Sequence, residues 1–466
     1  MIHTIGAGML WTCFFHFREL SLRNEANKRD GTISRRYKLH LIYPAPAKNR
    51  NTRHRKRSAS LVPINLPIIA GLTPDNFDIK IIDENIENID FSDTPDIVGI
   101  TGMTAVINRA YEIADIYRQK GTKVILGGIH VSMLPNEASG HADAIVIGEV
   151  ENVWSTVLSD FISGRLNRVY KGTMQMSLDG LGLIRRDLID KRSYSMPNPI
   201  LTSRGCPHNC TYCSVTEFWG YKFRHRPIDD TISEIKMIGD RWIAFVDDNI
   251  YGDIKHSKEL FKKMKDLKVR WVGQGDMRIA RNPELLELAR KSGCEWLFMG
   301  IETISTENLA SIHKSFNRGD KYAEAIAMIK STGIKVFGSF IFGLENDDES
   351  VFDRTVNFGI DNRLDGANFY ILTPFPGTQL FEQMDKDGLL LHKDWSKYDA
   401  NHVVFKHKNL SADQLLDGLV YAYKRFYSIP SIIKRVVYPR KDLAQVLALN
   451  TMRHLSTKRF ERGVRN

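Results

Sequence analysis

The sequence lacks the features that mark membrane and disulfide-rich proteins. No apolar run approaches the roughly 20 residues that a membrane-spanning helix needs, and the apolar stretch from Met9 to Phe17 is short and followed by charges that do not resemble a signal peptide. Only five cysteines occur in 466 residues, which argues against a disulfide framework. We therefore expect a protein of the reducing cytoplasm.

A basic surface over the whole body of the protein is also lacking. The net charge of +10 comes from the two ends: residues 1–60 carry 13 Lys and Arg against 3 Asp and Glu, and residues 430–466 carry 9 against 2. The intervening residues carry 43 against 50. This distribution does not predict a nucleic-acid groove. The basic ends could contact an anionic membrane surface, although solvated termini are the commoner explanation.

The chain is long enough for two or three domains. Residues 1–36 show no clean period and are expected to be an extension, and a basic run, Asn49–Arg57, follows the first predicted strand. From residue 37 to about 165, strands and helices alternate, which predicts a doubly wound parallel sheet. Its strands are expected at Lys38–Ile42, Phe77–Ile82, Ile97–Met103, Lys123–Ile129 and Ala142–Ile147, and its helices at Leu61–Leu72, Val106–Lys120 and Val153–Ile162.

Ligands of such sheets lie beyond the carboxyl ends of the strands. No Gly-x-Gly-x-x-Gly follows the first strand, so a dinucleotide is not expected there. Glycines at the other strand ends would let the backbone approach a ligand closely. The candidate binding residues at these ends are Thr101, Met103, Gly127, Gly128, His130, Gly148 and Glu149.

A connector is expected over residues 166–195, and a second alternation of strands and helices over residues 196–385. Six βα units there predict a partial (β/α)6 barrel, whose chemistry gathers at the carboxyl ends of its strands. The turn Thr373–Thr378 (T-P-F-P-G-T) follows the sixth strand, and its two prolines and glycine predict a rigid loop at the mouth. Residues 386–466 are helical in pattern, and we expect a C-terminal lid or a cap on the open edge of the barrel.

Three of the five cysteines, Cys206, Cys210 and Cys213, lie within eight residues in a C-x3-C-x2-C pattern. They follow an apolar strand and a turn at Gly205, so the thiols should lie on a loop at a strand end. Three close thiolates favour an iron–sulfur cluster with one open iron. The alternative is a zinc loop with His208 as the fourth ligand.

The pattern and its flanks, R-G-C-P-x-x-C-x-Y-C-S, resemble the signature of the radical S-adenosylmethionine (SAM) enzymes. This resemblance implies a [4Fe-4S] cluster on the three cysteines, which binds the amino and carboxylate groups of SAM. One-electron reduction would then cleave SAM to methionine and a 5′-deoxyadenosyl radical.

The resemblance also implies roles at the barrel mouth. Tyr212 and Ser339 correspond to positions near the adenine, Asp247 and Asp248 to the methionine end, and Glu302 to a G-x-E-S/T element. Gln274 belongs to a polar cluster after the third strand. Either aspartate could instead serve as a cap or turn residue. The trio Arg224–Arg226 could neutralise a carboxylate, but surface charge is the more ordinary use.

The strand ends G-I-T-G-M-T, V-I-L-G-G-I-H and A-D-A-I-V-I-G-E-V-E resemble the cobalamin-binding domain that precedes many radical SAM domains. The D-x-H-x-x-G loop that supplies a histidine to cobalt is absent, so the resemblance implies cobalamin bound without that ligand. The alternative is a scaffold or clamp that has lost the cofactor.

Together these resemblances imply a cobalamin-dependent methyltransferase of an unactivated carbon, with one SAM methylating cob(I)alamin and a second giving the radical. Alternatives are a cyclase or rearrangement enzyme, and a radical enzyme whose N-terminal domain binds only a partner or substrate. The substrate is expected to be a small or lipid-like molecule, and the electron donor a flavodoxin or ferredoxin.

Overall fold

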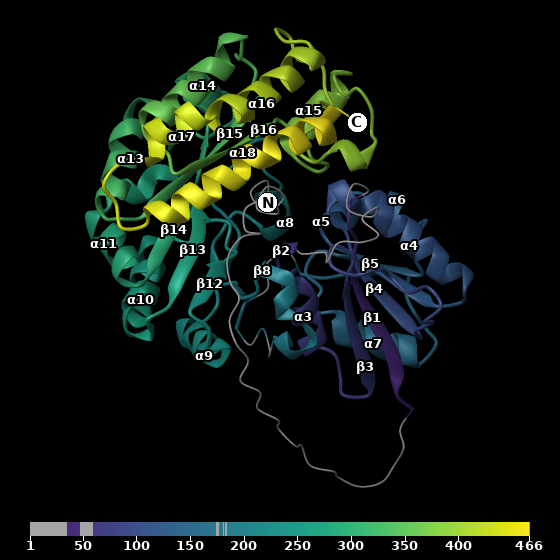
Figure 1. Ribbon diagram of the computed structural model, residues 1–466. Helices are drawn as coiled ribbons and strands as arrows, with labels where there is room; N and C mark the ends of the chain where they lie inside the picture. Colours follow the sequence, from purple (N-terminus) through teal and green to yellow (C-terminus); the bar gives the residue numbers. More distant parts are fainter. Residues whose placement is uncertain (1–34, 47–58, 174–176, 180, 182–183, 466) are drawn as a thin grey trace.

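Two parallel six-stranded sheets form the molecule (Figure 1). The computed structural model describes residues 35–46, 59–173, 177–179, 181 and 184–465, with the side chain of Ser60 excepted. The expected N-terminal extension and the run Asn49–Arg57 therefore lie outside the described residues. Within the described residues, no helix is long and apolar enough to cross a membrane.

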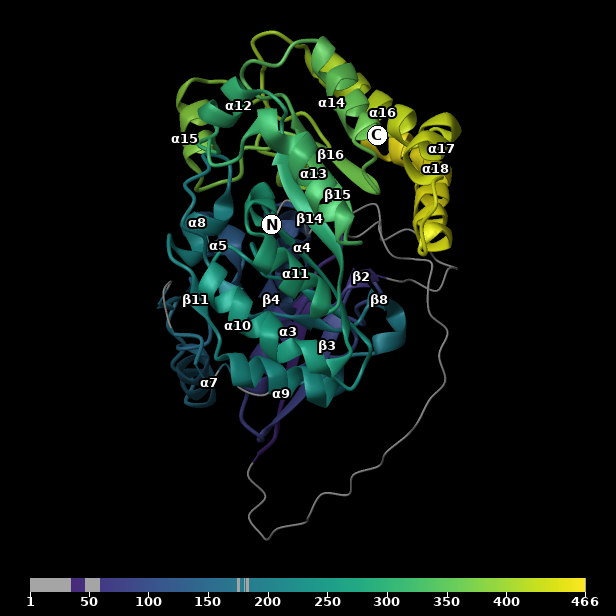
Figure 2. The ribbon, with the colours of Figure 1, turned by 90° about the vertical axis from the view of Figure 1, so that its left-hand side faces the viewer.

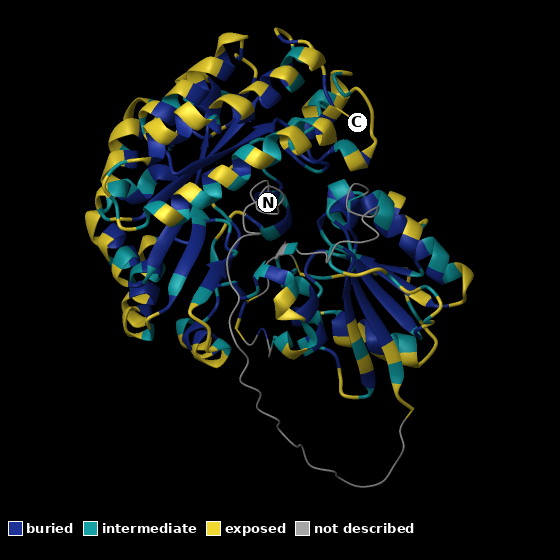
Figure 3. Ribbon diagram, viewed as in Figure 1, coloured by how far each residue is buried: buried dark blue, intermediate teal, exposed yellow. Residues whose placement is uncertain are grey.

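The first sheet has the order β3-β1-β4-β5-β6-β7, and all its pairings are parallel. From β1 the chain adds β3 on one side and then β4 to β7 on the other, so the strand order reverses between β1 and β4. Doubly wound folds bind ligands at this point. The central strands β4, β5 and β6 of this sheet are mainly apolar and largely buried, as expected for a sheet covered on both faces, whereas β1, β3 and β7 also carry charged residues (Figure 3). The strands are β1 (Tyr37–Tyr43), β3 (Phe77–Asp83), β4 (Ile97–Thr101), β5 (Lys123–Gly127), β6 (Ala144–Ile147) and β7 (Val169–Lys171).

Helices cover both faces of this sheet, so the predicted doubly wound fold is confirmed. On one face, α3 (Asn65–Gly71) and α7 (Trp154–Ile162) bury a core that includes Leu41 and Trp154. The other face packs α4 (Ile107–Gln119) against a second core, which includes Val98 and Ile113. The short helices α5 (Ile129–Met133) and α6 (Pro135–Ala138) follow β5.

Two local predictions were wrong. The helix expected from Leu61 begins only at Asn65, because Ala59–Leu61 (β2) instead pairs with Tyr194–Met196 (β8). Val169–Lys171, expected to be part of a connector, forms β7 and pairs with β6. Both strands are only three residues long, so they carry too little period to be recognised in a sequence.

The second sheet has the order β16-β15-β14-β13-β12-β9 and is also fully parallel, which confirms the six-unit partial barrel. Its helices pack on the outer face (Figure 2). The strands are β9 (Pro199–Ile200), β12 (Trp242–Phe245), β13 (Arg270–Gly275), β14 (Cys294–Glu302), β15 (Lys335–Phe342) and β16 (Gly366–Ile371); the helices are α9 (Ile228–Ile238), α10 (Ile254–Met264), α11 (Pro283–Lys291), α12 (Thr306–Ser311), α13 (Tyr322–Ser331) and α14 (Ser350–Asp361).

The C-terminal region is helical, as predicted. Helix α16 packs on α14 and β16, while the long α18 crosses in front of the sheet on the face opposite α10 and α11 (Figure 1). Ile432, Val436 and Val446 pack there against Trp296 and Phe337 of the inner face. The helices are α15 (Gln379–Lys386), α16 (Ala412–Phe426), α17 (Ile429–Val436) and α18 (Leu443–Arg465).

Candidate active site

The cysteine loop begins after β9 and a second short strand, β10 (Ser203–Arg204), and ends where Cys213 precedes α8 (Ser214–Trp219). Gly205 turns the chain with φ of +86°, and a Cβ there would lie 2.2 Å from the carbonyl oxygen of Lys222. The loop is fixed from both sides: Thr211 N donates to Ile312 O (3.3 Å), and Leu380 N donates to Thr211 O (3.0 Å). The three thiols are therefore held on a defined loop.

The environment of the thiols suits an iron–sulfur cluster. Burial raises the pKa of Cys206 and of Cys210 to about 12, so a cation must hold these sulfurs as thiolates. A four-iron cluster takes cysteine thiolates as its ligands, and the three thiols of this loop fit that group.

His208, the fourth ligand of the zinc alternative, is engaged elsewhere. Its ring stacks on Phe316 with centroids 3.7 Å apart, and its Nε2 lies 2.6 Å from Nη2 of Arg278. Arg278 in turn pairs with Asp276 at 2.7 Å. These contacts weigh against a zinc site completed by His208.

A buried ion pair lies beside the cysteine loop. Lys314 Nζ lies 2.6 Å from Oε1 of Glu302 and 3.5 Å from the hydroxyl of Tyr212. Glu302 has φ of +65° at an irregularity of β14, a strained conformation for a residue other than glycine. Burial raises the pKa of the Tyr212 hydroxyl, and the charge of Glu302 raises it further. The structure thus brings Tyr212 and Glu302 together.

The remaining residues predicted for SAM have different surroundings. Asp247 is fully buried and accepts from Thr202 N (3.1 Å), Thr202 Oγ1 (2.7 Å) and Ser203 Oγ (2.6 Å). Burial raises the Asp247 pKa to about 6 while these donors oppose the shift. Its carboxylate therefore braces the strand that leads into the cysteine loop. Gln274 donates to the Asp247 carbonyl oxygen at 3.0 Å.

Asp248 follows β12, and Ser339 lies within β15. Asp248 is half-buried, and desolvation raises its pKa while the charge of Arg204 lowers it. Ser339 is 3% exposed, on the inner face of β15, and its Oγ has no hydrogen-bond partner among the described residues. An orphaned buried hydroxyl is a candidate ligand contact.

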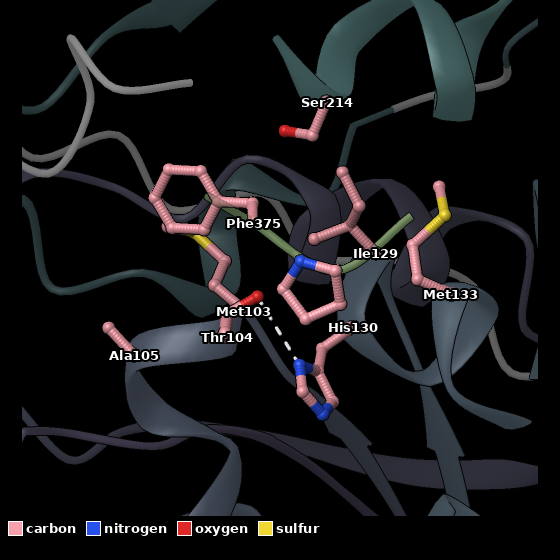
Figure 4. Close-up of a pocket in the computed structure, with 9 residues that line it drawn as sticks. Met103, Thr104, Ala105, Ile129, His130, Met133, Ser214 and Phe375 are labelled. Atoms are coloured by element: carbon pink, nitrogen blue, oxygen red, sulfur yellow. Dashed lines mark hydrogen bonds between the residues drawn. The ribbon is translucent and has the colours of Figure 1, made fainter. Parts of the chain in front are cut away.

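The carboxyl end of the first sheet forms one wall of a pocket whose other wall is the barrel mouth (Figure 4). The pocket has a cavity volume of only about 20 Å³, so a whole cobalamin would extend far beyond it. Its lining is mainly apolar and comes from the segment after β4, from α5, from the first residue of α8 and from the T-P-F-P-G-T turn. It comprises Met103, Thr104, Ala105, Ile129, His130, Met133, Ser214, Phe375 and Pro376.

Met103 and His130 are the two predicted cobalamin residues that line this pocket. His130 is tied back on both sides: Nδ1 lies 3.3 Å from the Thr104 hydroxyl, and Nε2 lies 3.3 Å from Oε1 of Glu137 (Figure 4 shows the first contact). Trp395 and Tyr111 donate to the same Glu137 carboxylate. The ring therefore packs the wall of the pocket with neither nitrogen free.

Four predicted residues shape the edge of the sheet and lie outside the lining. Gly128 has φ of +103°, and a Cβ there would lie 2.9 Å from the Gly102 carbonyl oxygen. Gly102 N donates to the Gly127 carbonyl oxygen at 3.0 Å. The Thr101 hydroxyl accepts from Asn65 at 3.1 Å. The Gly148 amide donates to Ser132 Oγ at 2.9 Å.

Glu149 joins the two sheets. Its carboxylate is fully buried and pairs with Arg204 (2.8 Å) and Arg224 (2.6 Å), both from the segment that carries the cysteine loop. Arg204 also pairs with Glu151 and stacks over Trp219. We call Glu149, Glu151, Arg204 and Arg224 the interdomain ion cluster. It fixes the cysteine loop against the first sheet.

Surface charge is the wrong interpretation of the Arg224–Arg226 trio. Arg224 belongs to the interdomain ion cluster, His225 pairs with Asp253 at 3.0 Å, and the buried Arg226 pairs with Glu234. Lys314 was missed entirely, because a lone lysine between two helices carries no sequence signal. The predicted burial of Glu302 indicated only that some cationic partner should lie near it.

Two family models match the chain in the order in which its sheets occur. The model of the B12 binding domain matches residues 55–158, and that of the Radical SAM superfamily matches residues 200–359. The first match ends before β7, and the second covers the cysteine loop through α14. Each match falls on one of the two parallel sheets.

Similar proteins with assigned functions cover most of the chain. The bacteriochlorophyllide d C-12(1)-methyltransferase of Chlorobaculum tepidum is 34% identical over 388 residues, which are 80% of this chain and 84% of that protein. The bacteriochlorophyllide d C-8(2)-methyltransferase of the same organism is 30% identical over 420 residues, 85% of this chain and 93% of that protein.

A solved structure supports the fold over nearly the whole length. The methyltransferase TsrM from Kitasatospora setae, determined with cobalamin and a [4Fe-4S] cluster, superposes with a TM-score of 0.67 at 15% identity. The match covers 92% of this chain and 99% of that one. It includes both sheets and the helical C-terminal region.

Proposed function

Because the chain belongs to the family of cobalamin-dependent radical SAM methyltransferases, we propose that Cys206, Cys210 and Cys213 hold its [4Fe-4S] cluster and that it methylates an unactivated carbon of a small molecule. The observation that carries this proposal is the shared pocket. Ser214, adjacent to the third cysteine, and Phe375 face the same space as Met103 of the first sheet. A radical formed beside the cysteine loop would therefore lie next to the carboxyl end of the first sheet.

The bound groups would supply electron transfer to SAM at the cluster, with formation of a 5′-deoxyadenosyl radical, and a methyl group at cobalamin. The chain's own residues position and enclose these groups. Glu302 can accept the ammonium group of SAM in a charge-assisted hydrogen bond. Lys314, 2.6 Å from Glu302, keeps that carboxylate ionised in a buried setting. Phe375 and Met103 line the pocket with apolar surface and exclude water from it.

The substrate class we propose is a chlorophyllide-like tetrapyrrole that carries a carboxylate. Two relatives that are at least 30% identical are named as bacteriochlorophyllide d methyltransferases. A hopanoid C-2 methylase from Rhodopseudomonas palustris is 25% identical, which makes a polycyclic lipid the second candidate. A cyclisation activity has the support of anaerobic magnesium-protoporphyrin IX monomethyl ester cyclases at 27% identity, of which the matched region covers 60–66%.

The test is methyl transfer by enzyme reconstituted without oxygen. The protein is loaded with iron, sulfide and hydroxocobalamin, reduced, and given methyl-labelled SAM with bacteriochlorophyllide d. We expect iron and cobalt to be retained and label to appear on a side-chain carbon of the macrocycle. A protein that retained no cobalt would contradict the proposed methyltransferase. Label on a hopanoid and not on the macrocycle would replace the substrate class.

The remaining partners form part of the same proposal. A flavodoxin or ferredoxin would reduce the cluster, and a cytoplasmic location would keep the three cysteines reduced. The basic charge of residues 430–466 would favour transient contact with anionic membrane, where an apolar pigment or lipid is delivered. Binding to vesicles that contain phosphatidylglycerol, and its loss at high salt, would test that contact.

A further inference from the structure

Helix α18 places an arginine against the inner face of the barrel. Arg453 is 4% exposed; its Nη2 donates to Oδ1 of Asn368 on β16 at 3.1 Å, and its guanidinium lies 6.0 Å from the ring of Phe337 on β15. Among the described residues, Arg453 has no carboxylate within 4.0 Å and no partner for its buried Nε. Four of its five N–H groups therefore have no hydrogen-bond acceptor within the part of the chain that the structure describes.

A second buried arginine nearby shows the contrast. Arg435 on α17 is also buried, but it donates to the carbonyl oxygens of Leu364 (2.7 Å) and Phe426 (3.0 Å), to Asn450 Oδ1 (2.9 Å) and to Ser431 Oγ (3.1 Å). Its guanidinium lies 3.8 Å from the Phe426 ring centroid. Arg435 is thus saturated by the fold, whereas Arg453 is not.

A buried cation that has neither a counter-charge nor a full set of hydrogen bonds is costly, so an anion that met Arg453 would be bound favourably. The groups beside Arg453 suit such an anion. Ser339 is the register partner of Asn368, and its Oγ has no partner among the described residues. Asn368 Nδ2 donates to the hydroxyl of Tyr370 at 2.8 Å. The Ser339 hydroxyl therefore lies in register beside Asn368, the residue that Arg453 contacts.

This polar group lies on the strands that lead to the proposed SAM site, because Ser339 of β15 pairs in register with Gly300 of β14, two residues before Glu302. Burial raises the pKa of Tyr370, and among the charges acting on it are Arg453, which lowers it, and Glu302, which raises it. Tyr370 is therefore within electrostatic reach of both residues. A molecule held at Arg453 would extend toward Glu302 and the cysteine loop at the carboxyl ends of the strands.

We propose that Arg453, with Asn368 and Ser339, binds a carboxylate group of the substrate inside the barrel. The inference rests on the proposed function, because it assigns one group of that substrate to one residue. It also assigns a role to the C-terminal helix: α18 both closes the inner face and selects acids over neutral molecules.

The first test needs no substrate and compares the two arginines in the reconstituted enzyme. Arg453→Met removes an unpaired buried charge, so the midpoint of urea unfolding should stay the same or rise. Arg435→Met removes a saturated hydrogen-bond centre, so the midpoint should fall. A fall of the same size in both variants would show that Arg453 is structural and would overturn the inference.

The second test measures binding of bacteriochlorophyllide d and of its carboxyl methyl ester by quenching of pigment fluorescence. We expect wild-type enzyme to bind the acid about 10- to 100-fold more tightly than the ester, the scale of one hydrogen-bonded ion pair. Arg453→Gln should bind both alike, Arg453→Lys should keep part of the preference, and the exposed Arg459→Gln should behave as wild type. Equal binding of acid and ester by wild type would overturn the inference and leave the methyltransferase intact.

If wild-type enzyme binds neither macrocycle, the proposed substrate class fails and a smaller probe decides about the anion site. Sodium propionate, at concentrations where propionamide has no effect, should raise the melting temperature of wild type and not that of Arg453→Gln. Propionate that stabilises both proteins equally, or neither, would overturn the inference.

Discussion

The two parallel sheets present different kinds of surface at the carboxyl ends of their strands. The end of the first sheet is built from glycine backbone and apolar side chains, and its single histidine in the pocket, His130, is bonded to Thr104 and Glu137. The end of the second sheet carries three thiols and the buried pair Glu302–Lys314. One surface offers shape, and the other offers charge and metal ligands.

This difference indicates that the two strand-end surfaces bind their cofactors in different ways. A large cofactor can be held by backbone shape, backbone hydrogen bonds and van der Waals contact, which tolerates many side chains. A cluster and a zwitterionic cofactor need specific ligands and counter-charges. Substitutions at the barrel mouth should therefore have larger effects than equally buried substitutions at the first sheet.

The largest effect is expected at the cysteines. Cys210→Ala should remove the cluster and lower methyl transfer by about 10³-fold or more, as for the loss of a central catalytic group. Cys294→Ala is the matched control, because that thiol is fully buried on β14 away from the loop. Iron content, visible absorbance and product formation are measured. Full activity of Cys210→Ala would overturn the ligand assignment.

The Glu302–Lys314 pair should come next. Glu302→Gln leaves a buried lysine without its counter-charge, which costs about 3–5 kcal/mol of unfolding free energy, and weakens SAM binding about 10- to 100-fold. Adding Lys314→Met should restore stability but not SAM affinity. Urea unfolding and equilibrium SAM binding separate the two effects. A double variant that recovered SAM binding would show that Glu302 does not contact the cofactor.

The interdomain ion cluster tests whether the two surfaces work as one site. Glu149→Gln should cost about 3 kcal/mol, because two arginines lose a buried carboxylate. The variant should also uncouple SAM cleavage from methylation, so that more 5′-deoxyadenosine is formed for each methylated product. Glu287→Gln, which breaks the exposed pair with Lys291, should cost less than about 0.5 kcal/mol. Unchanged coupling in Glu149→Gln would mean that the sheets are aligned by other contacts.

At the first sheet, backbone shape is tested by Gly128→Ala. The added Cβ would meet the Gly102 carbonyl oxygen at 2.9 Å with φ of +103°, so we expect a loss of about 1–3 kcal/mol and weaker cobalamin retention. Gly121→Ala, also at positive φ but with nothing within 4 Å of the added Cβ, separates backbone strain from crowding. Equal losses would mean that φ alone matters.

The smallest effect is expected at His130. Since both ring nitrogens bond Thr104 and Glu137, His130→Gln should change cobalamin affinity less than about threefold and leave the cobalt spectrum unchanged. A spectral shift that indicated loss of a nitrogen ligand would show that the ring leaves its partners to bind cobalt.

Both folds and the cysteine loop could be predicted from sequence because each has a local signal. Strands such as β4, β14 and β15 are mainly apolar runs, and the C-x3-C-x2-C spacing lies within eight residues. The short strands β2 and β7 lacked such a signal. Partners distant in sequence were also invisible: Glu149 was expected at cobalamin, yet it pairs with Arg204 and Arg224, and nothing local marks Arg453 as buried.

The most direct test of a shared site is anomalous diffraction from crystals of the reconstituted enzyme, recorded at the iron and cobalt absorption edges. We predict an iron peak between Cys206, Cys210 and Cys213, and a cobalt peak beside Met103 and Phe375, with the pocket between them. Cobalt at another edge of the first sheet, or iron away from the three cysteines, would contradict the account.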